Sequence, residues 1–283
     1  MAEIPAFETL GYREDDGVAW VTLERPEVYN AFNATMQREL RTLWRALRRR
    51  DEVRCIVLTG SGDKAFCTGI DRNEALGGAD GDATVGEDGE AVHVGAGETP
   101  FMFDDPGEDL GPKTCDLWKP VVAAVNGMAC GGAFYLLGEV DVIIATEAAT
   151  FFDPHVTYGM AAAFEPLQMT GRLPFGELAR MTLLGASERM SAQRAHQVGL
   201  VSELAADVDD LRARADWVAR QIADAPALAV QGSLRALWAG RDMGRGQALA
   251  LGYAFVGLGN SPEALAEGQE RFASGARLEW KLR

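Results

Sequence analysis

The sequence predicts an α/β fold, because short apolar runs typical of strands alternate with stretches of helical periodicity. Residues 18–23, 55–59 and 121–125 are apolar runs, rich in β-branched side chains, that carry no charge, as expected for strands. Residues 35–49 combine an apolar stripe at helical spacing with a face of arginines, as expected for a helix. Alternation of strands with helices favours a layered α/β architecture.

The predicted elements follow one another along the whole chain. Strands are expected at 18–23, 55–59, 121–125 and 142–145, and helices at 35–49, 192–198 and within 226–272. We therefore divide the chain into a core at 1–204 and a C-terminal helical region at 205–283. The core contains an acidic, glycine-rich insertion at 74–112.

Composition excludes several classes of partner. The 283 residues carry a formal net charge of −15, so nucleic acid is not expected to bind. No apolar run reaches the roughly 18 residues that a membrane-spanning helix needs, and no basic-then-apolar leader opens the sequence, so we expect a cytoplasmic protein. The four cysteines lack metal-ligand or CxxC spacing, which predicts reduced, buried thiols and no metal site.

Two glycine-containing turns carry the strongest functional information. Residues 65–71 and 126–134 each follow a strand-like run and precede a plausible helix. Such turns pass tightly through glycine and expose main-chain N–H groups. Two of these donors aimed at one carbonyl oxygen form an oxyanion hole, in which the loss of one donor costs roughly 3 to 4 kcal/mol of activation free energy.

With these turns in place, the sequence resembles the crotonase (enoyl-CoA hydratase/isomerase) family along nearly its whole length. The resemblance is carried by residues 25–33, 65–71, 119–141, 185–204 and 267–268. The run 119–127, followed by Gly131, Gly132 and Asp141, is its most specific part.

The resemblance implies a fold, a substrate and an assembly. It implies a spiral of ββα units whose C-terminal helices pack against neighbouring subunits in homotrimers or dimers of trimers. It implies an acyl-CoA thioester as substrate in fatty acid metabolism, with no cofactor beyond the coenzyme A of the substrate itself. The thioester oxygen would accept hydrogen bonds from the amides of Ile70 and Gly132. The remaining substrate-binding positions would be Val28, Thr68, Gly69, Asp71, Arg72 and Gly131.

The acid-base residues depart from the family pattern. Typical hydratases of the family use two glutamates, and Tyr135 and His155 occupy those positions here. Histidine has an ordinary pKa of about 6.5, so His155 is suited to act as a base near neutral pH. Glu165, ten residues later, is placed to orient its ring, Tyr135 to hold a water or donate a proton, and Asp153 is an alternative base. His155 as a structural cap is the competing interpretation.

The insertion at 74–112 has two interpretations. An acidic, glycine-rich segment loses too much conformational entropy on ordering to fold by itself, which predicts a mobile surface loop. Because it directly follows the first turn, it is also placed to act as a lid over the acyl pocket, with residues 101–103 as an apolar wall.

Three functions remain open at this point. The favoured one is an acyl-CoA hydratase or isomerase that stabilises a thioester enolate. The second is a hydrolase that cleaves a carbon–carbon bond in a β-diketone, using His155 with a carboxylate. The third is an acyl-CoA binder without turnover.

Overall fold

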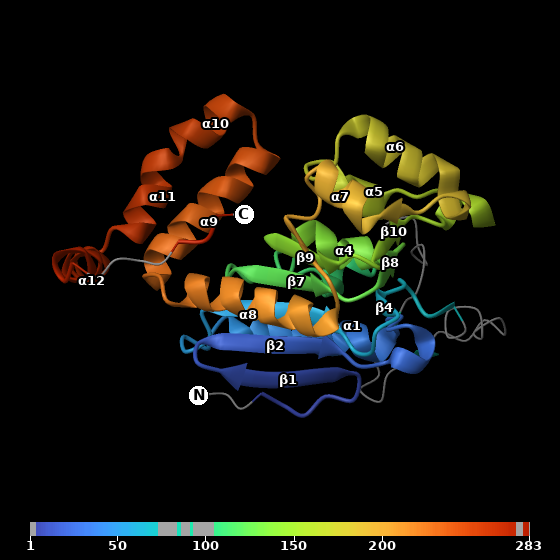
Figure 1. Ribbon diagram of the computed structural model, residues 1–283, viewed down its shortest axis with the longest axis horizontal. Helices are drawn as coiled ribbons and strands as arrows, with labels where there is room; N and C mark the ends of the chain where they lie inside the picture. Colours follow the sequence, from blue (N-terminus) through green and yellow to red (C-terminus); the bar gives the residue numbers. More distant parts are fainter. Residues whose placement is uncertain (1–3, 73–83, 86–90, 93–104, 276–279, 283) are drawn as a thin grey trace.

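The computed structural model describes residues 4–72, 84–85, 91–92, 105–275 and 280–282. It confirms the predicted α/β class, with helices packed around two mainly parallel sheets (Figure 1). The larger sheet has six strands, in the order β1 (Leu10–Asp15), β2 (Val18–Leu23), β3 (Cys55–Gly60), β7 (Val121–Val125), β9 (Val142–Thr146) and β12 (Glu203–Ala205). Among the described strands of this sheet, only β1 runs antiparallel to its neighbour.

Helices cover both faces of the larger sheet. On one face, α8 (Val208–Ala223) packs Leu211 and Ala215 against apolar side chains of β3, β7 and β9. On the other, α1 (Ala34–Leu47) buries its apolar stripe, and the Asn33 side chain caps the helix by accepting from the Met36 amide at 3.0 Å. Because both faces are buried, the central strands are continuous apolar runs.

The smaller sheet brings the ends of three distant segments together. Its order is β11 (Met190–Ser191), β10 (Thr150–Phe152), β8 (Met128–Cys130) and β4 (Ala65–Cys67). The strands β3, β7 and β9 of the larger sheet are each followed directly by a strand of this sheet. Because β4, β8 and β10 run parallel, the residues that follow them meet at one edge.

The remaining elements lie around this framework. They are η1 (Pro26–Val28), β5 (Thr84–Val85), β6 (Ala91–Val92), α3 (Gly107–Leu110), α4 (Ala133–Glu139), η2 (His155–Tyr158), α5 (Phe164–Met169), α6 (Phe175–Leu184), η3 (Gly185–Ser187) and α7 (Ala192–Gln197). The predicted C-terminal helices are confirmed as α9 (Ala227–Asp242), α10 (Arg245–Ala250), α11 (Gly252–Gly259) and α12 (Pro262–Ala273).

The C-terminal helices extend beside the larger sheet (Figure 1). The base of this region is tied to the core, because Trp238 donates to Asp141 at 2.7 Å and Arg241 to the Gly138 carbonyl at 2.9 Å. The helix α8 lies after residue 204 but packs on the core sheet. The division at 204/205 therefore stays a prediction.

Most of the predicted insertion at 74–112 lies outside the described residues, including 101–103. Its end is ordered around α3, where Trp44 donates to the Leu110 carbonyl at 2.9 Å. Within the described ranges, no helix is both long and apolar enough to cross a membrane.

Candidate functional site

The two glycine turns approach each other closely where β4 and β8 end. Gly69 has a φ of +83°, a conformation that favours glycine. A methyl group added at Gly69 would lie 2.8 Å from the Gly132 amide nitrogen, and one added at Gly132 would lie 2.6 Å from the Phe32 ring. Only hydrogen fits at either position, so both glycines are required by packing.

The two predicted donor amides lie in these turns. The strand-like bridge between Phe32 and Ile70 uses the carbonyl of Gly69 and the amide of Asp71, each in a 2.8 Å bond with Phe32. This pairing leaves the Ile70 amide outside the bridge. Within the described part of the chain, neither the Ile70 nor the Gly132 amide donates a hydrogen bond.

The predicted substrate-binding loops also lie side by side. Thr68 donates a 3.4 Å hydrogen bond to the Tyr29 carbonyl, directly after η1 and Val28. Asp71 is buried and forms a 2.8 Å ion pair with Arg25, so its side chain ties the two loops together. Arg72 is exposed, and its guanidinium lies 4.2 Å from the centre of the Tyr158 ring.

His155 lies beside the second turn and is oriented by Asp153. A methyl group added at Gly131 would lie 3.7 Å from the His155 Cε1 atom. The His155 Nδ1 atom is 2.5 Å from Asp153 Oδ1, which also accepts from the His155 amide at 3.0 Å. Asp153 is only 1% exposed, whereas the imidazole is 20% exposed. The bond to Asp153 raises the pKa of His155, assisted by the charge of Glu165 and opposed by burial.

Glu165 faces the other ring nitrogen. Its Oε1 atom is 3.3 Å from His155 Nε2, and its side chain is 8% exposed. Burial raises the pKa of the Glu165 carboxyl, and the nearby charges of Asp153 and Asp105 add to this, whereas His155 opposes it. Asp153, rather than the Glu165 expected from the sequence, holds the Nδ1 atom of the ring, and Glu165 lies on the Nε2 side.

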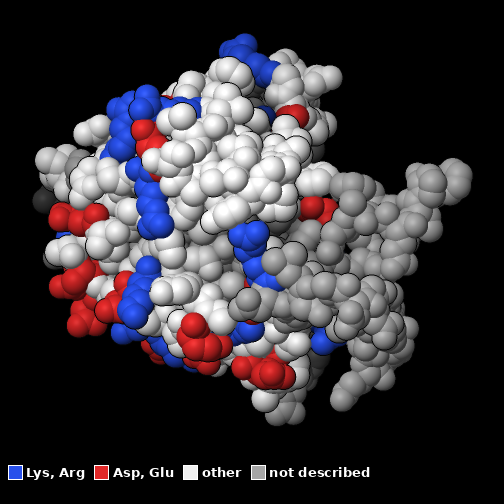
Figure 2. Space-filling view, turned by 90° about the vertical axis from the view of Figure 1, so that its right-hand side faces the viewer, with Lys and Arg blue, Asp and Glu red and all other residues white. Residues whose placement is uncertain are grey.

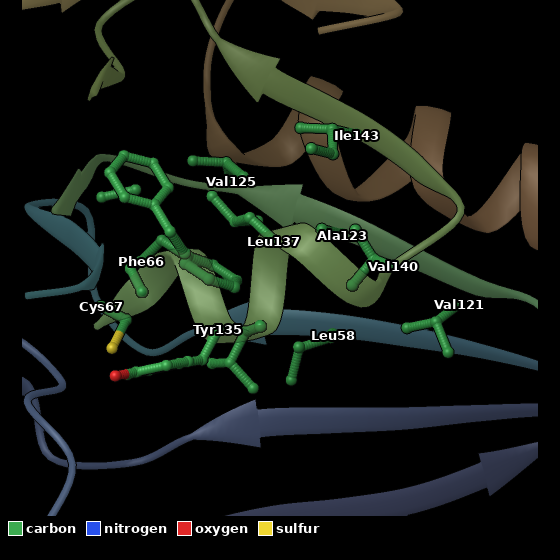
Figure 3. Close-up of a cluster of buried hydrophobic side chains, with 14 of the residues drawn as sticks. Leu58, Phe66, Cys67, Val121, Ala123, Val125, Tyr135, Leu137, Val140 and Ile143 are labelled. Carbon is green, nitrogen blue, oxygen red and sulfur yellow. The ribbon is translucent and has the colours of Figure 1, made fainter. Parts of the chain in front are cut away.

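Tyr135 extends this network to Asp105. Its hydroxyl donates to Asp105 Oδ2 at 2.9 Å. Figure 3 shows the Tyr135 ring beside the buried apolar cluster with its oxygen directed away from Leu58 and Val121. Burial raises the pKa of Tyr135, as do Glu165 and Asp105, which disfavours Tyr135 as the proton donor expected from the sequence.

A pocket of about 400 Å³ opens beside Tyr135 and Asp105. Phe164 and Leu167 contribute its apolar lining. It shares Leu167 with a neighbouring cavity of about 650 Å³ that reaches Trp238 on α9.

Other polar and sulfur-containing residues near the site have structural roles. Burial raises the pKa of Cys67 and of Cys130 to about 12, so neither is a ready thiolate nucleophile. All four cysteines are free and buried, as predicted. Glu139 accepts from the Thr114 amide at 2.8 Å, away from His155. In the described ranges no cluster of three or more His, Cys, Asp or Glu side chains has the geometry to hold a metal ion.

Sequence reasoning missed Asp105 as a site residue. It lies in a run of ten acidic residues spread over 80–109, and nothing in that pattern distinguishes it from its neighbours. Its contact with Tyr135 joins residues 30 positions apart and depends on tertiary packing.

Comparisons with known proteins show the family of this chain. A family model for enoyl-CoA hydratase/isomerase matches residues 13–281. An (E)-benzylidenesuccinyl-CoA hydratase of Thauera aromatica is 32% identical over 260 residues, which cover 90% of this chain and 92% of that protein. A 1,2-epoxyphenylacetyl-CoA isomerase of Escherichia coli is 32% identical over 213 residues, 75% of each chain.

Solved structures show the same fold. A crystal structure of an enoyl-CoA hydratase/isomerase from Mycobacterium paratuberculosis superposes with a TM-score of 0.82 at 34% identity. The match covers 98% of this chain and 100% of that chain.

Proposed function

Because the chain belongs to the enoyl-CoA hydratase/isomerase family, we propose that it adds water reversibly to a 2-enoyl thioester of coenzyme A. The observation that carries this proposal is the Asp153–His155–Glu165 network beside the two glycine turns. It supplies a base and a separate acid, which hydration needs and simple binding does not.

The amides of Ile70 and Gly132 would hold the thioester oxygen. Both N–H groups are free within the described chain and lie in turns that approach each other. Donors fixed in this way stabilise an enolate oxygen without reorganising during the reaction. The coenzyme A arm would lie along the loops of Val28 and of residues 68–72.

His155 would act as the base. With Nδ1 held by Asp153, the neutral ring presents the Nε2 lone pair to a water molecule. As the O–C3 bond forms, His155 takes the water proton, and the electron pair of the double bond moves to the thioester oxygen as an enolate.

Glu165 would act as the acid. Its raised pKa favours the protonated form, which gives its proton to C2 as the enolate collapses. The proton on His155 then returns to Glu165 across the 3.3 Å contact between Nε2 and Oε1, and the site is restored. If no water adds, transfer of a proton between carbons by the same groups gives a double-bond isomerase.

The pair of His155 and Asp153 also supports a second candidate function. A histidine oriented by a buried carboxylate can also direct water at a carbonyl carbon, which is the chemistry of β-diketone cleavage. The family relatives named here carry coenzyme A substrates in their names, so we favour hydration.

The assay for this proposal uses 2-enoyl and 3-enoyl thioesters of increasing chain length, with loss of the conjugated absorbance and product mass as readouts. Hydration predicts loss of absorbance with the gain of one water. A chromophore change at constant mass would replace hydration by isomerisation. Turnover of a cyclic β-diketone without turnover of any enoyl thioester would select the second function, and binding without any turnover would leave an acyl-CoA binder.

We also propose that the chain assembles into homotrimers or dimers of trimers. Large apolar side chains on the C-terminal helices are exposed, with Tyr253 at 91% and Phe272 at 90%. A second exposed set lies on α5 and α6, at Leu167, Phe175 and Leu183. Figure 2 views the side on which α5 and α6 lie and shows a broad uncharged area there. Burying such surfaces against other copies would remove apolar area from water.

A further inference from the structure

We propose that Arg241, on helix α9 of the C-terminal region, is a positioning residue for the reaction. It fixes the two helices that carry the Gly132 amide and Glu165 relative to each other. The inference rests on the proposed function, because it concerns the oxyanion donor and the acid named there. Arg241 itself needs no contact with the substrate.

The two helices connect the site to Arg241. Helix α4 begins directly after Gly132, and α5 carries Glu165 in its first turn. They have 7 and 6 residues, which corresponds to a length of about 9 to 11 Å. Over so short a distance, a displacement at the carboxyl end of a helix moves the amino end as well.

Arg241 joins the carboxyl ends of these two helices. Its Nη1 atom donates to the Gly138 carbonyl at 2.9 Å, and its Nη2 atom donates to the Gln168 carbonyl at 2.6 Å. Gly138 and Gln168 are the next-to-last residues of α4 and α5. Carbonyls in the last turn of a helix lack partners within the helix, and a positive charge there is favoured by the helix dipole. One planar guanidinium group therefore holds both helix ends at a fixed separation.

The two helices also touch at the point that Arg241 bridges. A methyl group added at Gly138 would lie 2.5 Å from the Gln168 Cβ atom. The backbone of α4 therefore lies directly against the α5 side chain, with no spare room between them. Arg241 bonds the same two residues from the side of α9, so it fixes a contact that packing alone brings together.

The guanidinium of Arg241 is itself held in place. Its central carbon is 4.7 Å from the centre of the Trp238 ring, and Trp238 donates to Asp141 Oδ1 at 2.7 Å. Asp141 also accepts from the Val121 amide of β7 at 2.7 Å, which ties this group to the larger sheet. A methyl group added at Gly171 would lie 2.5 Å from Arg241 Nε, so the side chain rests on the turn after α5.

A neighbouring arginine does not provide the same bridge. Arg172 donates to the Gly138 carbonyl at 3.1 Å and also to the Val140 carbonyl, both at the end of α4. It therefore supports α4, whereas Arg241 connects α4 with α5. Loss of Arg241 should let Glu165 shift relative to the thioester oxygen, and a misplacement of about 1 Å can reduce a rate by about 100-fold.

The first experiment compares kcat with KM for the enoyl thioester. Arg241→Ala and Arg241→Gln both remove the bridge. Arg235→Ala is the matched control, because Arg235 lies on the same helix and stacks on Trp118 at 4.4 Å, but has no hydrogen bond to α4 or α5 within the described chain.

We expect kcat to fall about tenfold or more in both Arg241 variants, with KM changed by less than about twofold. KM should be preserved because the loops proposed to hold the coenzyme A arm, at Val28 and 68–72, belong to other elements. Arg235→Ala should keep the wild-type kcat. An unchanged kcat in the Arg241 variants, or an equal fall in Arg235→Ala, would overturn the proposal.

The second experiment needs no turnover. Amide hydrogen exchange, followed by mass spectrometry, reports how firmly α4 and α5 are held. Gly171→Ala joins the set, because it displaces the Arg241 side chain without removing it and covers the case in which an Arg241 variant does not fold.

Peptides from 133–139 and 164–169 should exchange faster in Arg241→Gln and Gly171→Ala than in the wild-type protein, while those from 34–47 keep their rates. Wild-type exchange rates in both helices would overturn the proposal, as would faster exchange to the same extent in Arg235→Ala. A protein that hydrates no enoyl thioester would contradict the proposed function alone, and the exchange rates would still decide whether Arg241 fixes the two helices.

Discussion

At the scale of single residues, the site combines an imidazole and a carboxyl group whose surroundings favour different charge states. The hydrogen bond to Asp153 raises the pKa of His155 and so favours its charged form. Burial and the charges of Asp153 and Asp105 raise the pKa of Glu165 and so favour its neutral form. A histidine and a glutamic acid in contact can divide the work of base and acid.

Replacing Asp153 should expose the importance of the His155 tautomer. In Asp153→Asn the side-chain amide can donate to Nδ1, which places the ring proton on Nε2 and removes the lone pair that the base needs. We expect kcat to fall by about 10² to 10⁴, measured by loss of enoyl absorbance. Asp209→Asn, at a position whose side chain is 96% exposed, is the control. Equal activity in the two variants would remove Asp153 from the mechanism.

The raised pKa of His155 also predicts a pH dependence of stability. A group with a raised pKa in the folded state stabilises the fold fully below its unfolded pKa of about 6.5, and this stabilisation is lost as the pH rises through the folded value. The difference in unfolding free energy between the wild type and His155→Gln should therefore be larger at low pH than at high pH. Denaturant unfolding at both pH values measures it, and the opposite order would contradict the assigned ion pair.

At the scale of elements, the decisive feature is the meeting of two turns after β4 and β8. The prediction for Gly69 follows from its backbone and its neighbour. In Gly69→Ala, a side chain in the left-handed region would also press on the Gly132 amide. We expect a loss of roughly 100-fold or more in kcat, as for removal of an oxyanion donor.

Gly199→Ala is the matched control for this substitution. Gly199 has a φ of +85°, but nothing lies within 4 Å of the position that its new methyl group would take. Both substitutions strain the backbone, because both glycines have a positive φ. Only Gly69→Ala also disturbs the contact between the two turns. Equal rates in the two would show that the approach of the turns does not serve catalysis.

The elements themselves were largely predictable from the sequence. Buried strands such as β3 and β7 are unbroken apolar runs, and α1 has an apolar stripe that begins at an Asn cap. Ile70, Gly132 and His155 were named from the family resemblance, and the structure places all three at the edge where β4, β8 and β10 end. The role division between Asp153 and Glu165 could not be predicted, because it depends on which side of the imidazole each carboxyl group reaches in three dimensions.

At the scale of the whole molecule, the exposed apolar helices predict assembly. Light scattering on the purified protein should give about three or six times the 30.4 kDa mass of the chain. The Phe272 side chain is 90% exposed, and Phe272→Glu, which replaces it by a charged one, should lower that mass. A monomeric wild-type protein at micromolar concentration would contradict the proposed trimer. The cytoplasmic location and the absence of a separate cofactor stay predictions.

The most direct test of the proposed enolate chemistry uses a saturated acyl-CoA in heavy water. If the Ile70 and Gly132 amides stabilise an enolate and the His155–Glu165 pair moves the proton, the enzyme should exchange the C2 hydrogens of the thioester for deuterium. Mass spectrometry should then show that the thioester gains deuterium with the wild-type protein. The double variant His155→Gln/Glu165→Gln should exchange far less. A wild-type protein that binds the thioester but exchanges no C2 hydrogen would contradict the account.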